Sequence, residues 1–124
     1  MWQHAHTFVL DIYRVTADFP SHERYGLVSQ MRRAAVSIAA NIVEGHKRRS
    51  RKEFLNFLNI ADSSLEELKY YLLLSRDLQY LASSVVKQLY QQAERVGRML
   101  SGLKAHIKQG VANEHTLRSV PAGA

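Results

Sequence analysis

Four apolar stripes, each spaced alternately by three and four residues, constrain the fold of this chain more than any other feature. Such spacing places apolar side chains on one helix face and is typical of a seam between nearly aligned helices. The stripes are Ala5, Phe8, Ile12, Val15 and Phe19; Val28, Met31, Ala35, Ile38 and Ile42; Phe54, Leu58, Ala61, Leu65, Leu68 and Leu72; and Leu89, Ala93, Val96, Leu100, Leu103 and Ile107. Together they predict an all-α, up-and-down antiparallel four-helix bundle.

Helix boundaries are indicated by a few residues between these stripes. Pro20 is expected to open the second helix, where its missing N–H carries no cost, and Gly45 is expected to end it. Ser50 and Glu53 form an S-x-x-E capping box that predicts the start of the third helix. The block from Phe19 to Leu68 therefore reads as two amphipathic helices joined by a short turn.

The length of the chain, 124 residues, suits one domain that can bury a stable core without disulfides or structural metal sites. It has no cysteine, which excludes disulfides and thiolate metal sites. Gly110 is expected to end the fourth helix, and the sequence after it has no apolar periodicity. We therefore expect a bundle over residues 1–110 and a flexible C-terminal tail over residues 111–124.

The formal net charge of +6 attracts polyanions generally, such as nucleic acid or an anionic surface. No signal-peptide pattern is apparent at the N-terminus, and no charge-free helical stretch is long enough to span a bilayer. A basic amphipathic helix with bulky aromatic residues, which would attach to a membrane surface, is also missing. These features predict a cytoplasmic protein with no membrane role.

The strongest candidate site is the basic connector between the second and third helices. Arginine presents a planar fork that matches phosphate oxygens, and the start of the third helix adds a favourable dipole. The connector residues are Lys47, Arg48, Arg49, Arg51 and Lys52. They predict contact with the phosphates of RNA or DNA, and the alternative is a solvated charged turn that keeps the protein soluble. Secondary contributions are expected from Arg95, Arg98, Lys104 and Lys108 of the fourth helix.

Arg32 and Arg33 interleave with core positions of the second helix, so at least one of them is expected to face a neighbouring helix. A carboxylate such as Glu44, Glu66 or Glu67 would satisfy an inward-facing arginine. This structural pairing is favoured over a phosphate-binding role, because core positions surround both arginines.

Aromatic residues give little indication of a platform for single-stranded nucleic acid. Tyr25 and Gly26 are expected to shape the start and packing of the second helix more than to form a ligand site. The remaining candidates for base stacking are more typical of half-buried bundle positions. They are Trp2, Tyr70, Tyr71, Tyr80 and Tyr90.

Motifs for catalysis and for metal binding are missing from the sequence. The six histidines do not cluster at helical spacing, and no glutamate has a histidine three residues later, as di-iron bundles require. No H-E-x-x-H, G-x-S-x-G or Walker-type phosphate loop occurs. We expect a protein that is not an enzyme and that uses no cofactor and no metal.

A family resemblance covers about half of the chain, from Phe19 to Leu68. The residues that carry it are Phe19, Pro20, Glu23, Tyr25, Gly26, Leu27, Gln30, Arg32, Arg33, Ala34, Ala35, Ser37, Ile38, Asn41, Ile42, Glu44, Gly45, Arg48, Ser50, Glu53, Phe54, Phe57, Leu58, Ile60, Ala61, Ser64, Glu67 and Leu68. This block resembles the bacterial four-helix-bundle proteins encoded within intervening sequences of 23S ribosomal RNA genes. Ser63 departs from that pattern, since the family often has glycine there.

The resemblance implies a four-helix bundle that forms ring-like homo-oligomers, with pentamers as the expected state. It also implies kinship with the accessory variability determinant proteins of diversity-generating retroelements. Those proteins resemble basic, barrel-shaped pentamers that bind nucleic acid and a reverse transcriptase. A reverse transcriptase is therefore one expected kind of protein partner.

The predicted function is that of a non-catalytic nucleic-acid-binding or accessory protein that contacts phosphates through the connector. The alternative is an oligomeric protein–protein interaction scaffold without a nucleic-acid role. The third helix leaves that alternative open, because it is apolar well beyond its seam: such a helix is either central in the bundle or in contact with a partner chain. Its additional apolar residues are Phe57, Ile60, Tyr71, Leu73 and Leu74.

Overall fold

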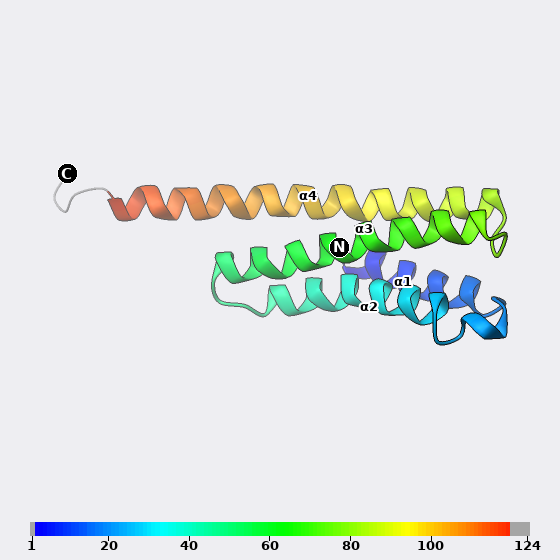
Figure 1. Ribbon diagram of the computed structural model, residues 1–124. Coiled ribbons are helices and arrows are strands. Elements are labelled where there is room, and N and C mark those ends of the chain that lie inside the picture. The colour runs from blue at the N-terminus through cyan, green and yellow to red at the C-terminus, as the bar shows by residue number, and fades with distance from the viewer. Residues whose placement is uncertain (1, 120–124) are drawn as a thin grey trace.

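The computed structural model describes the backbone of residues 2–119 and the side chains of residues 2–113. Within these residues the protein is all helical and has no strand. Four long helices run up and down side by side, and one short 3-10 helix joins the first two (Figure 1). The elements are α1 (Trp2–Thr16), η1 (Ser21–Glu23), α2 (Leu27–His46), α3 (Arg51–Asp77) and α4 (Ser83–Ser119).

The helices differ greatly in length, and this makes the two ends of the bundle unlike each other. α1 packs against α2 and α4 in the half that contains η1 and the turn from α3 to α4. The other half, which contains the α2–α3 connector, has no α1 beside it, and there α4 runs on past the connector (Figure 1). No helix in the described part of the chain combines the length and the apolarity needed to cross a membrane.

The core confirms the four predicted stripes. Every stripe residue of α2 is buried, and the other three helices each leave only one predicted position partly accessible. The partly accessible positions are Val15, Phe54 and Leu103. Side chains of all four helices meet in one continuous apolar cluster, which holds α2 and α3 together along their length.

The start of α2 differs from the prediction. Pro20 precedes η1, and α2 begins only at Leu27, after Gly26. The side chain of Glu23 takes the place of a cap, because its Oε1 accepts a hydrogen bond from the Leu27 N–H at 3.3 Å. Tyr25 does not pack at the helix start as expected, since it is 89% exposed.

The α2–α3 boundary follows the sequence closely. α2 ends at His46, and the hydroxyl of Ser50 accepts the backbone N–H of Glu53 at 3.1 Å, as the capping box predicts. Gly45 lies in the last turn of α2 and is buried against α3. A Cβ at this position would lie 2.7 Å from Phe54 Cδ1, so the glycine permits close contact between the helices as well as marking the helix end.

The predicted end of the fourth helix at Gly110 is wrong, because α4 continues through it to Ser119. A glycine inside a helix costs only about 1 kcal/mol relative to alanine, which packing compensates. Here Val111 packs on the core, and the side chain of Arg51 occupies the space beside Gly110, where a Cβ would lie 2.9 Å from Nε. Residues 111–119, expected to be a flexible tail, are therefore helical, while 120–124 lie outside the described residues.

Candidate nucleic-acid interface

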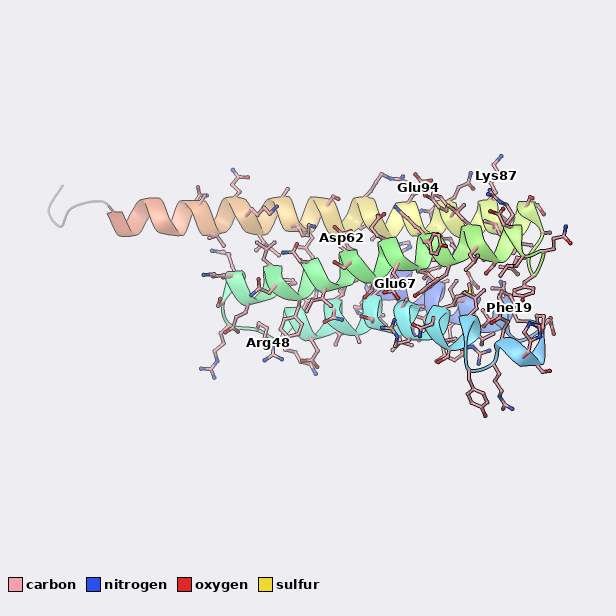
Figure 2. The ribbon with its side chains drawn as sticks, in the orientation of Figure 1. Phe19, Arg48, Asp62, Glu67, Lys87 and Glu94 are labelled. Atoms are coloured by element: carbon pink, nitrogen blue, oxygen red, sulfur yellow. The ribbon has the colours of Figure 1, made fainter. Side chains whose placement is uncertain are left out.

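The basic connector occupies the end of the bundle opposite Phe19 (Figure 2). Lys47 to Ser50 link the two helices, and Arg51 and Lys52 belong to the first turn of α3. All five predicted cations are exposed. The structure thus brings them together where α2 meets α3, next to the positive end of the α3 dipole.

Arg48 does not extend freely into solvent. Its Nη2 lies 2.9 Å from Oε2 of Glu44, one turn earlier in α2, and its guanidinium lies 4.7 Å from the centre of the Phe57 ring. The nearby carboxylate offsets its charge, and stacking on the aromatic ring limits its orientation. Arg48 is therefore a weaker candidate for phosphate contact than the sequence suggested.

Arg51 faces α4, where its side chain fills the space beside Gly110. The three other connector cations, Lys47, Arg49 and Lys52, are exposed and have no carboxylate partner among the side chains of residues 2–113. These three form the accessible positive charge of the connector. An anion that approached this end would meet them first.

The cations of α4 do not gather at the connector as a group. Lys104 Nζ donates to Oδ2 of Asp62 at 2.8 Å, and only 16% of its side chain is exposed, so it fastens α4 to α3. Arg95 and Arg98 are exposed, but they lie about 20 Å along α4 from Gly110. Among the α4 cations whose side chains the structure describes, only Lys108 is both exposed and close along the helix to the connector.

Arg33 has the structural role that we predicted, with the carboxylate of Glu67 at 2.9 Å. The two side chains are 59% and 37% exposed, so the pair lies at the surface and not in the core. Glu67 also accepts a hydrogen bond from the hydroxyl of Tyr71 at 2.5 Å. This bond, together with burial and the nearby charge of Glu67, raises the pKa of Tyr71.

Arg32 turns toward α1. Its Nε donates to the hydroxyl of Thr16 at 3.0 Å, and its Nη2 donates to the carbonyl of Tyr13 at 3.2 Å. The guanidinium also lies 4.6 Å from the centre of the Tyr13 ring. Both arginines of the second helix are thus held by specific contacts, and they use different neighbouring helices.

Metal-ligating side chains do not gather anywhere in the part of the chain that the structure describes, where no group of three or more could hold an ion. The residues that sequence reasoning missed are the partners of the basic side chains. Glu44 could have been found, because it lies in the last turn of α2, four residues before Arg48. The contacts of Lys104 with Asp62 and of Arg51 with the Gly110 region join distant segments and leave no local signal.

Comparisons with known proteins agree with this architecture. The sequence model of a family described as 23S rRNA-intervening sequence protein matches residues 1–102. A crystal structure of a protein of unknown function from the S23 ribosomal protein family of Bacteroides thetaiotaomicron VPI-5482 has a similar fold, with a TM-score of 0.75. That protein is 24% identical, and the similarity covers 83% of this chain and 96% of the other. No curated protein matches this sequence.

Proposed function

Because this chain belongs to the 23S rRNA-intervening sequence protein family, we propose that its basic connector binds the phosphates of RNA or DNA. In this proposal the protein is a non-catalytic nucleic-acid-binding or accessory protein of the cytoplasm. The observation that carries it is the group of three exposed cations, Lys47, Arg49 and Lys52, that has no carboxylate partner among the described side chains.

Electrostatics supports a site that recognises the backbone and not the base sequence. Lysine and arginine side chains that neutralise phosphates release counterions, so binding weakens steeply as salt increases. Among the side chains of residues 2–113, no phenylalanine, tyrosine or tryptophan is exposed beside the connector cations: Phe54 and Phe57 are half-buried, and they contact His46 and Arg48. The proposed contact is therefore with phosphate oxygens of either nucleic acid.

Self-association belongs to the same proposal. A ring-like homo-oligomer, with a pentamer as the expected state, would repeat the connector around an axis and increase its summed field. Light scattering in solution would test this directly, because a pentamer has five times the 14.2 kDa mass of the chain. A mass equal to that of one chain would contradict it.

The experiment for the connector is fluorescence anisotropy with structured RNA, duplex DNA and single strands over a salt series. We expect Lys47→Ala, Arg49→Ala and Lys52→Ala together to lower the slope of log affinity against log salt by about 2 to 3. The comparison variant removes three exposed cations of α4, by Lys87→Ala, Arg95→Ala and Arg98→Ala. It should lower the slope less than the connector variant, because Arg95 and Arg98 are expected to be only secondary contributors. Equal loss in both triple variants would contradict a connector site, as would failure of the wild type to bind any polyanion at low salt.

The alternative, an oligomeric protein–protein scaffold, is supported by apolar side chains on the outer faces of α2 and α3. Val36, Val43 and Ile60 are all exposed, although each would be expected to favour a buried position. A protein partner, for which a reverse transcriptase is one candidate, would cover this face. Salt-insensitive capture of such a partner by a protein that binds no polyanion would favour the scaffold.

A further inference from the structure

A second basic surface lies at the other end of α2, where α1 and the residues after η1 border an open hollow of about 530 Å³. We call it the Arg–Tyr groove and define it by Tyr13, Arg24, Tyr25, Ser29, Arg32 and Arg33. A neighbouring hollow of about 370 Å³ shares two of these arginines, Arg24 and Arg32, so their side chains are accessible from both hollows. The length of α2, about 30 Å, separates this groove from the connector.

Two of the three groove arginines have no carboxylate partner among the side chains that the structure describes. Arg33 is neutralised by Glu67, whereas Arg24 forms no ion pair and Arg32 binds a hydroxyl and a carbonyl. The nearest carboxylate in sequence, Glu23, is occupied elsewhere. It accepts hydrogen bonds from the Tyr80 hydroxyl at 2.9 Å and from the Leu27 N–H. The groove therefore has uncompensated positive charge that an anion would satisfy.

Tyr25 is the most exposed large hydrophobic side chain in the described part of the protein, at 89%. A tyrosine of a helical bundle usually lays its ring on apolar surface and leaves only the hydroxyl in water. Here the ring stands free beside Arg24, whose guanidinium lies 5.9 Å from its centre. Tyr13, which also lines the groove, lies with its ring against the guanidinium of Arg32.

An exposed aromatic ring beside unpaired arginines has the chemistry that binds an unpaired nucleotide. Every base has a π-face that stacks on an aromatic side chain, and the adjoining phosphate accepts hydrogen bonds from arginine. Bases of a duplex stay stacked inside the helix and cannot reach such a ring. An apolar peptide would cover the charges of Arg24 and Arg32 without supplying an anion to compensate them, which disfavours it.

We propose that the Arg–Tyr groove binds single-stranded nucleic acid, with one base stacked on Tyr25 and a phosphate held by Arg24 and Arg32. The inference rests on the proposed function and gives it a preference for unpaired strands. The connector attracts any nucleic-acid backbone, and the groove selects the strands whose bases are free. A single-stranded loop or end is therefore the expected ligand.

The test uses fluorescein-labelled single strands of about 12 nucleotides, in RNA and DNA form, and the matching duplexes. We expect Tyr25→Leu to weaken single-strand binding about 5- to 150-fold and to leave duplex binding unchanged. Tyr25→Phe keeps the ring and should bind like the wild type. Tyr70→Leu is the matched control, because Tyr70 is exposed on α3 and does not line the groove.

A base analogue reports the stacking itself. A strand that carries 2-aminopurine should lose fluorescence on binding to the wild type and to Tyr25→Phe, and should lose less on binding to Tyr25→Leu. The phosphate contact is tested by Arg24→Gln, which should lower the salt slope for single strands by about 0.7. Circular dichroism should show the same helicity in every variant, since the replaced side chains of Arg24, Tyr25 and Tyr70 are all exposed.

The outcomes separate this proposal from the connector proposal. Binding that is unaffected by Tyr25→Leu, or equal loss for single strands and duplexes, overturns the groove while the connector stands. Binding that depends on Tyr25 but not on the three connector cations supports the groove and overturns the connector. Failure of the wild type to bind any strand overturns both. A lower oligomer mass in Tyr25→Leu assigns the groove to subunit contact and overturns it as a nucleic-acid site.

Discussion

The two ends of α2 both present cations to solvent, but the structure holds these cations in different ways. At the connector, Lys47, Arg49 and Lys52 project from a turn and the first turn of α3 without a carboxylate partner among the described side chains. At the Arg–Tyr groove, Arg32 is fixed by Thr16 and by the carbonyl and ring of Tyr13. The difference follows from the short α1, which covers only the groove half of the bundle (Figure 1).

This difference indicates what each end can recognise. A free lysine or arginine side chain carries about 2 kcal/mol of rotamer entropy, part of which is lost when it binds a phosphate. The connector therefore suits a diffuse, salt-dependent attraction to many ligands. Arg32 is already ordered, so the groove loses less entropy and can favour one ligand geometry.

The largest expected effect concerns the core beneath the two ends. Leu72 lies one turn before Ser75, which contacts Met31 in the half of the bundle where Arg32 contacts α1. Leu58 lies two turns after the start of α3, in the connector half. Both are fully buried, so each change to alanine should cost about 2–5 kcal/mol of unfolding free energy. We expect the larger cost for Leu72→Ala, because α1 packs on this half of the bundle as a fourth helix and should limit the collapse of the cavity.

Urea unfolding at one protein concentration measures both costs, since self-association would otherwise shift the apparent stability. Ile38→Val is a suitable reference for a small core change, with an expected cost of about 0.5–1.5 kcal/mol. A cost for Leu58→Ala equal to or above that for Leu72→Ala would contradict a more tightly supported groove half.

The second prediction concerns the close contact that fixes the connector. Gly45→Ala places a Cβ 2.7 Å from the Phe54 ring, which must shift, and we expect a loss of about 1–3 kcal/mol. The matched control is Gly102→Ala in α4, where no atom lies within 4 Å of the added Cβ. This control should gain about 0.5–1 kcal/mol from helix propensity. If thermal unfolding shows that both variants gain stability, or that both lose it, the close contact between Gly45 and Phe54 is refuted as the cause of the loss.

The core could be predicted from the sequence because helix geometry is local. The alternation of three and four residues decides which side chains share a face, and nearly all stripe residues are buried as expected. The Ser50 cap was equally predictable, since its partner Glu53 lies three residues away. Pairing of Arg33 with Glu67 needed only the additional assumption that α2 and α3 are neighbours.

The remaining features depend on contacts between distant segments. Gly110 looks like a helix stop, but the Arg51 side chain from another helix occupies the space beside it. Lys104 looks like an accessible cation until Asp62, 42 residues away, binds it. Tyr25 looks like a packing residue in the sequence, but the sequence does not show whether an aromatic ring beside a turn points inward or into solvent. Charge could therefore be located from sequence, but its accessibility could not.

A smaller effect would distinguish cations within the connector. Arg49→Ala should lower the salt slope for nucleic acid by about 0.7 to 0.9, whereas Arg48→Ala should lower it less, because Glu44 already offsets Arg48. Glu44→Gln removes this carboxylate and should strengthen binding, with a loss of stability of only about 0.3–0.5 kcal/mol. Anisotropy at several salt concentrations measures the affinity and the salt slope of all three variants. Equal slopes for Arg48→Ala and Arg49→Ala would show that the ion pair does not restrict Arg48.

The smallest expected effect is at the groove end and appears only in alkaline solution. The hydrogen bond that the Tyr80 hydroxyl donates to Glu23, with smaller contributions from burial and from the charge of Glu23, raises the pKa of Tyr80 above its ordinary value of 10.0. A raised pKa in the folded state means that the bond stabilises the protein fully below pH 10 and that this stabilisation is lost as the pH rises through the folded value. Tyr80→Phe should therefore be less stable than the wild type near neutral pH, and the difference should shrink above pH 10.

Urea unfolding between about pH 7 and pH 11 measures this difference in stability, with Tyr70→Phe as the control that removes an exposed hydroxyl of α3. A stability difference that stays constant with pH would contradict the hydrogen bond from the Tyr80 hydroxyl to Glu23. The Glu23 carboxylate would then be available to pair with Arg24 and to neutralise the charge of the groove.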